Sequence, residues 1–438
     1  MIHPAKPRQL AEAFQYRQDG VLTVVYFIFI IVVSILGGIA FDVASVVSAR
    51  TQLQVTADAA AHAALVEREW HSADDAKTKA MAVALQNMPQ DRYGNVLTQE
   101  NIVFGHWDRD TTIFTQDNNS RNAVLVTTER DTQNGNPVAT FLLQFVGLWD
   151  WDVRTSSVFE TFYPTCLMEG FVAEGVVDIQ SNNSYFNGFC IHSNSHVEIN
   201  NNNFFESGTV VSMPDTNDLV VPTDGLSDEK NQGLADALHE GKWFIKILNR
   251  LDEIVAGVQD RDHRYAREYI NNYNIVALNK TRVGPTDLPK GRIYTVDCNS
   301  KFTFDAGIYD EIVLIANCPL TFKNGAEFHE AVIITTSTSN KSMSAPNNLT
   351  LGEADDCNPG GGAQLITYGG FEVAASLEMH GSQIIAAGDV EFAANADGIR
   401  GASIVSGGRI DGTSNMNFAF CGDGMEHSFL AEYFRLAK

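Results

Sequence analysis

Acidic side chains gather in one stretch of the chain where they could perform acid–base chemistry. Two carboxylates a few ångströms apart, with pKa values pushed apart by their surroundings, can act as general acid and base on a glycosidic bond. In a chain with 54 acidic residues such a cluster is usually a solvated surface, so we predict no catalytic residues. The side chains that a glycosidase would use here are Asp305, Asp310, Glu327, Glu330 and His329.

Two histidines could hold a metal ion if the fold brought them together. His192 and His196 lie four residues apart in the segment HSNSH, whose serine and asparagine neighbours indicate turns. The glycine runs at Gly360, Gly369 and Gly407 lack the strand-to-helix setting of a nucleotide-binding loop and read as turns. The sequence therefore predicts no metal site and no cofactor.

All six cysteines lie after residue 160, and none forms a C-x-x-C pair. This spacing argues against zinc binding and against thioredoxin-like redox chemistry. An even number of cysteines in an oxidising compartment predicts three disulfides, and six buried free thiols are the alternative. The cysteines are Cys166, Cys190, Cys298, Cys318, Cys357 and Cys421.

An uncharged apolar stretch runs from residue 21 to 41. About 20 helical residues cross a hydrocarbon core, so the stretch predicts a transmembrane helix. A net charge of −24 excludes a phosphate-backbone partner and leaves attachment to this helix. The positive-inside tendency predicts that residues 1–20 form a cytoplasmic tail and that the bulk is exported. The basic residues before the stretch are Lys6, Arg8 and Arg17.

Strong helix formers continue directly after the apolar stretch, which predicts a stiff stalk reaching to about Met88. Small residues recur along one side of this stalk, and such a stripe lets another helix approach closely. The sequence leaves open whether the stripe meets a partner subunit or packs on the chain's own domain. The small residues are Ala57, Ala60, Ala61 and Ala64.

This N-terminal region resembles the TadE/TadG-like proteins of the Tad (tight adherence, Flp) pilus assembly system. The matching pattern is Gly20, the apolar span, Asp42, Arg50, Leu53-Gln54 and Ala57-Asp58-Ala59-Ala60. The resemblance implies a structural or assembly role at the bacterial inner membrane, without catalysis, and pilus or pilus-assembly subunits as partners. The expected helix–helix contacts are Asp42, Arg50, Leu53, Ala57, Asp58, Ala60 and Ala64.

The chain departs from related pilus proteins at two points. Pseudopilins cut by prepilin peptidase carry a glutamate five residues after the cleavage glycine, whereas Val25 stands five after Gly20, so we expect the anchor to be retained. The Asp-x-Ser-x-Ser metal motif of a von Willebrand A-type domain is missing, so the resemblance implies no metal site.

Short alternating runs and turns up to residue 163 predict a small α/β, pilin-like module over 42–163. Beyond it the sequence repeats with an offset of 20 residues: Val177-Asp178-Ile179 recurs as Val197-Glu198-Ile199, and GSQIIAAGDV recurs as GASIVSGGRI. This period, with paired asparagines and turn glycines, favours a right-handed parallel β-helix, with a jelly roll or sandwich as the alternative.

We thus predict an α+β chain with a β-solenoid in two parts, 164–223 and 276–425. A 3–4 spacing of apolar residues indicates a helical insertion at 224–275, and residues 426–438 should close the chain as a short helix. Coils lie ~4.8 Å apart, within reach of a disulfide, which favours consecutive pairing of the cysteines.

The function expected from these features is a non-enzymatic, single-pass inner-membrane component of a Tad-type pilus, similar to a minor pilin. Its exported β-helix would be a scaffold or a binding head in the periplasm or at the cell surface. A membrane-tethered polysaccharide hydrolase or lyase, and an adhesin that binds glycans, remain alternatives. Membrane lipid, surface glycan and peptidoglycan are the further candidate partners.

Overall fold

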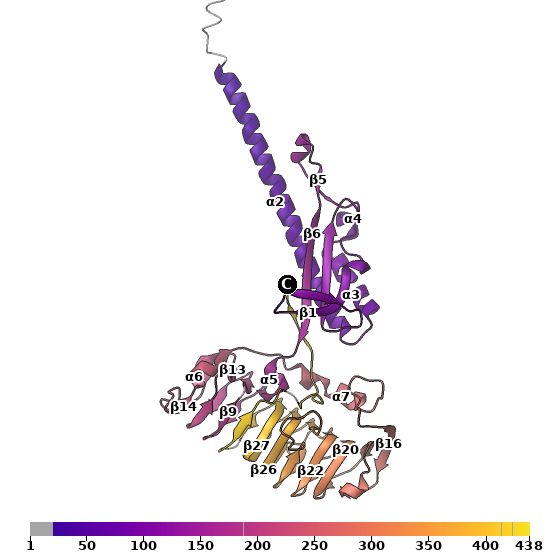
Figure 1. Ribbon diagram of the computed structural model, residues 1–438, viewed down its shortest axis with the longest axis vertical. Coiled ribbons are helices and arrows are strands. Elements are labelled where there is room, and N and C mark those ends of the chain that lie inside the picture. The colour runs from indigo at the N-terminus through magenta and orange to yellow at the C-terminus, as the bar shows by residue number, and fades with distance from the viewer. Residues whose placement is uncertain (1–20, 187, 413, 423) are drawn as a thin grey trace, which may run out of the picture. The chain divides into compact units, whose positions relative to one another are not determined.

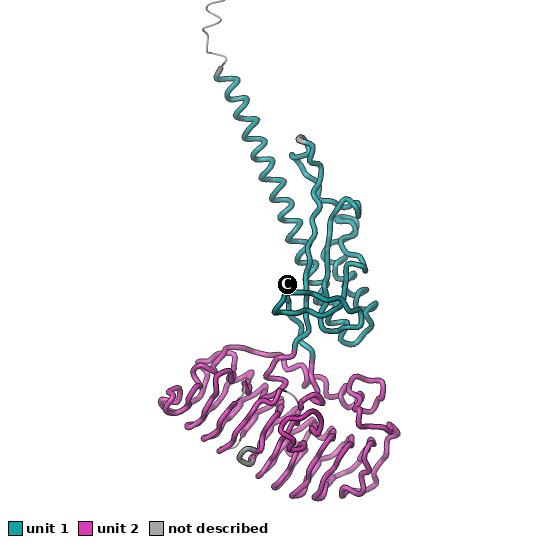
Figure 2. The backbone as a smooth tube through the Cα atoms, viewed as in Figure 1, with its two compact units in different colours: residues 1–162, 432–438 teal, residues 163–431 magenta. Residues whose placement is uncertain are grey.

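The computed structural model describes residues 21–186, 188–412, 414–422 and 424–438. Lys6, Arg8, Arg17 and Gly20, and with them the predicted tail, lie outside the described residues. The chain forms two compact units (Figure 2). Unit 1 comprises Met1–Phe162 and Glu432–Lys438, and unit 2 comprises Tyr163–Ala431.

Unit 1 begins with one long helix, α2, which runs from Val21 to Arg68 (Figure 1). Among the described residues it is the one helix long and apolar enough to cross a membrane. The predicted stalk is shorter than expected, because α2 ends at Arg68 and a separate helix, α3 (Ala73–Asn87), packs against it. Ser72 and Asp75 form a capping box that starts α3, since each side chain satisfies a free backbone amide of the other residue.

The predicted small α/β module is an antiparallel sheet in the order β2-β1-β3-β6-β30, packed on the two helices. Along β1 and β3, buried residues, mostly apolar, broadly alternate with more exposed ones, as one-sided burial of a sheet requires. The strands are β1 (Ile102–Asp108), β2 (Ile113–Gln116), β3 (Ala123–Arg130), β6 (Val153–Phe162) and β30 (Tyr433–Leu436).

The predicted C-terminal helix at 426–438 is wrong, because this segment contributes strand β30. The strand pairs antiparallel with β6, and Tyr433 lies opposite Phe162. An open sheet edge offers a row of unpaired amides and carbonyls, and pairing with them outweighs a weak local preference for helix. Unit 2 is therefore inserted, along the chain, between two neighbouring strands of one sheet.

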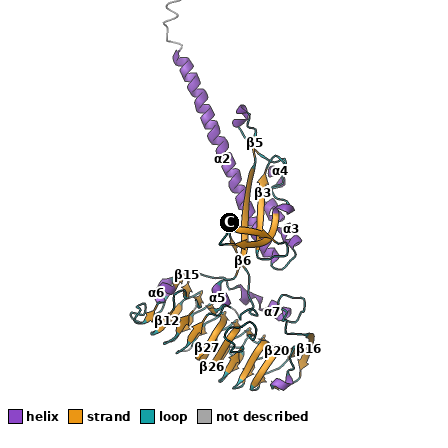
Figure 3. Cartoon of the chain, in the orientation of Figure 1, coloured by secondary structure: helices purple, strands orange, loops and turns teal. Residues whose placement is uncertain are grey.

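Unit 2 is a β-solenoid built from short parallel strands (Figure 3). Its first part, together with the short helix α5 (Thr165–Met168), contains β7 (Gly170–Ala173), β8 (Val177–Ile179), β9 (Ser184–Phe186), β10 (Cys190–Ser193), β11 (Val197–Ile199), β12 (Asn203–Phe205) and β13 (Val210–Met213). Val177 pairs with Val197 and Ile179 with Ile199, so the 20-residue repeat is the structural period.

The second part carries longer strands as well as short ones. They are β16 (Asn272–Leu278), β17 (Arg282–Val283), β18 (Arg292–Val296), β19 (Phe302–Phe304), β20 (Gly307–Ala316), β21 (Leu320–Phe322), β22 (Ala326–Thr335), β23 (Met343–Ala345), β24 (Leu349–Leu351), β25 (Ala363–Thr367), β26 (Phe371–Ala386), β27 (Val390–Ser406), β28 (Ile410–Asp411) and β29 (Asn417–Ala419). Inward residues of both parts form one continuous apolar core.

Stacks of like side chains fix the register of the coils. Phe418, Tyr185 and Phe205 form an aromatic stack, with ring centroids 4.9 and 5.1 Å apart. The predicted asparagine ladder is also present. The buried amide oxygen of Asn203 accepts the backbone N–H of Asn183 at 2.9 Å, and that of Asn231 accepts the N–H of Asn203 at the same distance. A coil shifted by one residue would lose both stacks.

The coils do not stack in chain order. The first coil, which starts at β7, lies in parallel register with β27, so that Gly170 pairs with Ser403. The same coil pairs on its other side with β10. The chain therefore enters the solenoid in its middle, builds toward one end, crosses to the far end and returns coil by coil to the entry point.

The predicted helical insertion at 224–275 is only partly helical. Two short strands inside it, β14 (Asn231–Gln232) and β15 (Leu238–Glu240), still extend the solenoid. The helices are short: α6 (Leu234–Ala237), the 3₁₀ turn η4 (Lys246–Arg250) and α7 (Leu251–Gly257). The apolar residues that suggested one long helix are buried, but they lie on short helices and the turns beside them. They are Ile245, Ile247, Leu251, Ile254 and Val258.

Candidate functional site

The structure does not assemble the four carboxylates into an acid–base pair. Asp305 accepts from Arg282 at 2.6 Å, and Asp310 pairs with Lys290. Glu327 lies 2.7 Å from His329 of the same strand, β22. Each of these three carboxylates thus has a basic side chain as its own partner, which is the arrangement of a structural pair rather than of a shared catalytic proton.

Glu330 is the most enclosed of the four. It lies 2.9 Å from His427 and accepts the backbone N–H of Gly361 at 2.8 Å. Burial raises the pKa of Glu330, but these two contacts and the charge of Arg267 outweigh burial and hold that pKa below its ordinary value. A carboxyl kept ionised in this way anchors the loop at Gly361, and it is poorly suited to donate a proton.

The two histidines also have separate partners. His192 is fully buried, where its Nδ1 lies 2.7 Å from Ser212 Oγ and its Nε2 3.0 Å from Asn194 Oδ1. Burial lowers the pKa of His192, so the imidazole is neutral at physiological pH. His196 lies 3.2 Å from Glu198. Within the described residues no group of three or more His, Cys, Asp or Glu could hold a metal ion.

The six cysteines form three disulfides in the predicted consecutive order. Cys166 bonds Cys190, Cys298 bonds Cys318 and Cys357 bonds Cys421, with Cα atoms 4.8, 5.7 and 5.7 Å apart. The first bond joins helix α5 to strand β10, and the second links two successive coils. The third joins segments 64 residues apart in the sequence. Cross-links of this kind restrict the unfolded chain and so stabilise the coils.

The alanine stripe packs inside unit 1, which was the alternative to a partner contact. Four residues of α2 are fully buried: Leu53, Ala57, Ala60 and Ala64. Of these, Leu53, Ala60 and Ala64 belong to one core with α3 and the sheet. The prediction that these four meet another subunit is therefore wrong for this fold, because alanine also allows α3 and the sheet to approach α2 closely. Arg50 is exposed, and Asp58 accepts from Gln54 at 2.9 Å on the same helix.

Asp42 has an intramolecular role that the sequence did not predict. The residue is 1% exposed. Its carboxylate accepts three successive backbone amides, from Phe141 at 2.6 Å, Leu142 at 2.8 Å and Leu143 at 2.7 Å. These amides open the 3₁₀ turn η2 (Leu143–Val146), whose first amides lack partners within the turn. Asp42 thus caps η2 from the end of the apolar part of α2.

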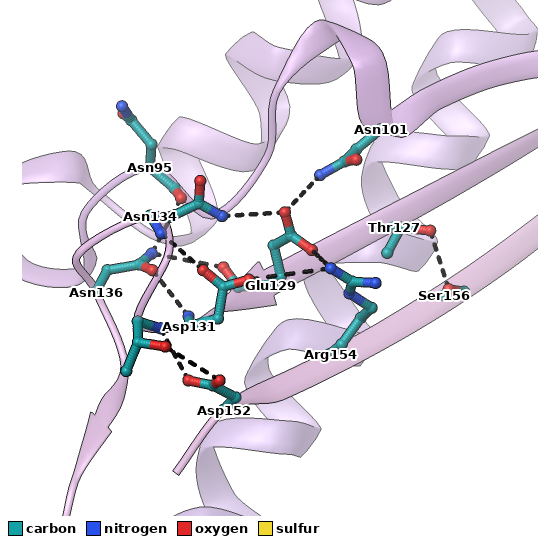
Figure 4. A network of polar contacts seen from close by, with 11 residues as sticks. Asn95, Asn101, Thr127, Glu129, Asp131, Asn134, Asn136, Asp152, Arg154 and Ser156 are labelled. Carbon is teal, nitrogen blue, oxygen red and sulfur yellow. Dashed lines mark hydrogen bonds and ion pairs between the residues drawn. The ribbon is translucent and has the colours of Figure 1, made fainter. Parts of the chain in front are cut away.

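The segment 140–149, hereafter the apolar loop, joins β4 (Val138–Ala139) to β5 (Asp150–Trp151). A polar network holds the base of this hairpin (Figure 4). In it, Glu129 accepts from Asn101 and Asn134, each at 3.0 Å, and pairs with Arg154 at 2.6 Å. Asp152 accepts the N–H of Thr132 at 2.8 Å. The network thus holds the base of the hairpin, and Asp42 holds the first part of the loop, residues 141–143.

A row of carboxylates on the solenoid was also missed by the sequence interpretation. Five acidic residues occupy matching outward positions on successive coils, in the pairing order Glu372, Glu391, Asp411, Asp178 and Glu198. We call this row the acidic ladder. The signal was present in the sequence, because an acid between inward apolar residues recurs as FEV, VEF, VDI and VEI, and follows the inward isoleucine in IDG.

Arg409 compensates part of the acidic ladder. Its guanidinium pairs with Asp178 and lies 3.6 Å from Asp411 and 4.0 Å from Glu198. Burial, together with the charges of Asp411 and Glu198, raises the pKa of Asp178 despite the opposing effect of Arg409. Parallel coils ~4.8 Å apart force these like charges together, so the ladder is held under electrostatic strain.

The fold and these sites define a single-pass membrane protein that carries a disulfide-bonded β-solenoid. Residues 20–82 match a family described as Flp pilus-assembly TadE/G-like, residues 59–158 match one described as Tad-like Flp pilus-assembly, and residues 170–422 match a domain of unknown function (DUF7867). Over more than half its length the chain belongs to the DUF7867 family. Residues 20–158 are similar to the two Tad pilus-assembly families. It is thus a pilus-associated component. Neither a comparison with curated proteins nor one with solved structures returned a match.

Proposed function

We propose that this protein is a non-enzymatic structural or assembly subunit of a Tad-type pilus, similar to a minor pilin. In this proposal residues 1–20 are cytoplasmic, α2 crosses the inner membrane, and the solenoid is exported as a binding head. The match of residues 20–158 to Tad pilus-assembly families is the observation that carries the proposal. Lys6, Arg8 and Arg17 before the span support the orientation.

Two features support a head rather than an enzyme. Each candidate carboxylate has its own lysine, arginine or histidine partner. These carboxylates are Asp305, Asp310, Glu327 and Glu330. The solenoid is joined to the module by two chain segments that leave from paired residues, Phe162 and Tyr433. A unit joined at one point of a sheet can be presented to a surface ligand, such as a glycan or peptidoglycan, without disturbing the module.

A strain lacking this protein tests the proposal. We expect the null strain to lose or strongly reduce its pili, and expect the full chain to restore them. A chain with residues 163–431 replaced by a short glycine–serine loop should restore filaments but not surface binding. Normal piliation of the null strain would contradict the pilus role, and turnover of an acidic polysaccharide by the full chain that Glu327→Gln abolishes would favour an enzyme.

A further inference from the structure

The apolar loop leaves several large apolar side chains at least half exposed. Phe141 is 65% exposed, Phe145 80%, Leu148 50% and Trp149 66%. An exposed apolar patch on one short loop costs solubility and usually marks a contact with another apolar phase. The polar network at the hairpin base holds these side chains in a fixed place, so their exposure is a property of the fold.

The loop lies beside the membrane-spanning part of α2. Leu142, Leu143 and Phe145 line a groove of about 480 Å³ together with α2 residues Ile30, Ile31, Ser34, Ile35 and Ile39. A Cβ atom at Gly38 would lie 2.5 Å from Leu142 Cδ1, so the glycine allows the loop to approach the helix closely. The rings of Phe41 and Phe141 are 5.6 Å apart. The exposed side chains therefore continue the apolar surface of the span.

Most backbone amides of the loop have a hydrogen-bond partner, which favours a lipid environment. Asp42 accepts the amides of three residues, and Thr140 N–H donates to Trp149 O at 3.0 Å. The amides of Phe145, Gly147 and Leu148 donate to carbonyls within the loop, at 3.2, 3.1 and 3.2 Å. The Thr140 hydroxyl donates to Leu148 O at 2.5 Å. Unpaired amides and carbonyls cost several kcal/mol each in hydrocarbon, so these pairings reduce the cost of placing the loop in lipid.

We propose that the apolar loop enters the bilayer and that acyl chains of the leaflet next to the end of the span cover Phe141, Phe145 and Leu148. From Asp42 back to Ile31 is 11 helical residues, which at 1.5 Å each is ~16 Å. This depth is about half of a ~30 Å hydrocarbon core, so the loop reaches through one leaflet. Trp149 then lies nearer the interface, where tryptophan is enriched.

Asp42 positions the loop on the helix. Its buried carboxylate stands at the end of the apolar stretch and is matched by three amides, so neither the charge nor the amides remain unpaired. A carboxamide offers one acceptor oxygen in place of two and turns its NH₂ toward backbone donors. Asp42→Asn should therefore loosen the loop while leaving the span intact. The inference rests on α2 crossing a membrane and does not depend on the pilus assignment.

Photo-crosslinking of the full chain tests the inference. p-Benzoylphenylalanine is introduced at Phe145, at Leu36 in the span as positive control and at Ile113 of β2 as negative control; the last two are 62% and 58% exposed. The protein is reconstituted in phosphatidylethanolamine–phosphatidylglycerol vesicles, irradiated and examined by mass spectrometry for lipid adducts. We expect the adduct yield at position 145 to lie within about threefold of that at 36 and about tenfold above that at 113.

Each further outcome decides the matter. An adduct yield at 145 no higher than at 113 overturns the inference. Irradiation in cells that gives a protein adduct at 145, without lipid, also overturns it and assigns the loop to a neighbouring subunit. With Asp42→Asn we expect the yield at 145 to fall several-fold while the yield at 36 is unchanged. An unchanged yield at 145 contradicts the positioning role of Asp42.

Discussion

At the scale of single residues, the acidic ladder shows how a repeating fold concentrates charge. The solenoid period places Asp178, Glu198 and Asp411 in neighbouring coils, where the charges of the other two disfavour ionisation of Asp178. Because the pKa of Asp178 is raised, its protonation favours the fold. That contribution is complete below the ordinary carboxyl pKa and is lost as the pH rises through the raised value.

Arg409→Met should expose this strain. Without the guanidinium, the pKa of Asp178 rises further. The variant should lose about 1 kcal/mol of stability at pH 7.5, a modest loss because the Arg409 side chain is partly solvated. Near pH 4 the loss should be much smaller, because Asp178 is then largely protonated. Thermal unfolding at both pH values measures the loss. Arg400→Met is the matched control, since its partner Asp356 is 91% exposed, and it should change stability little. A stability loss of Arg409→Met that becomes larger as the pH falls would refute electrostatic strain in the acidic ladder.

Individual residues also show which contacts can be predicted from the sequence and which cannot. Cys298, Cys318 and the asparagine pairs could be placed because each pair is offset by one 20-residue repeat. Asp42 was noticed as part of a family pattern, but its three amide donors lie about 100 residues further along the chain. No local spacing predicts a contact of that sequence separation.

At the scale of elements, α2 is the main case in which an open alternative was resolved. An alanine stripe reads the same whether it meets a partner or its own sheet, because both need small side chains. The continuation beyond Arg68 and the C-terminal helix were mispredicted because helix propensity is weak beside tertiary contacts. Strand β30 forms because β6 offers an unpaired edge, which the local sequence does not reveal.

Ala60→Leu tests the packing of α2. Ala60 is fully buried in the module, so three added carbons should overpack the core and destabilise unit 1 by about 1–3 kcal/mol. Val55→Leu on the opposite side, where Val55 is 58% exposed, should have almost no effect. Denaturant unfolding followed by circular dichroism would measure both. Equal stability of the two variants would return the stripe to the role of a partner contact.

At the scale of the whole molecule, the coil order limits what a sequence can predict. Repeats fix the pairing of neighbouring coils, such as β8 with β11. Coils of the same length present similar strand edges to their neighbours, however. The sequence therefore does not reveal that β7 stacks on β27. This closure places the start and the end of the solenoid together, and it lets the whole unit be inserted between β6 and β30.

The insertion predicts that the module is independent of the solenoid. Joining Phe162 to Tyr433 through a short glycine–serine loop recreates an ordinary antiparallel hairpin, because these residues already lie opposite each other. The shortened chain should insert in membranes and keep the protease resistance of unit 1. Rapid degradation of unit 1 in this variant, with the full chain stable, would mean that the module needs the solenoid in order to fold.

The central claim is that the Tad-family region makes this protein part of a pilus machine. The most direct measurement is affinity purification of the tagged chain from solubilised inner membranes, with mass spectrometry of the bound proteins. We predict that Tad pilus-assembly components co-purify with the full chain and equally with the solenoid-less chain. Their absence from both preparations, under conditions that keep the machine intact, would contradict the account.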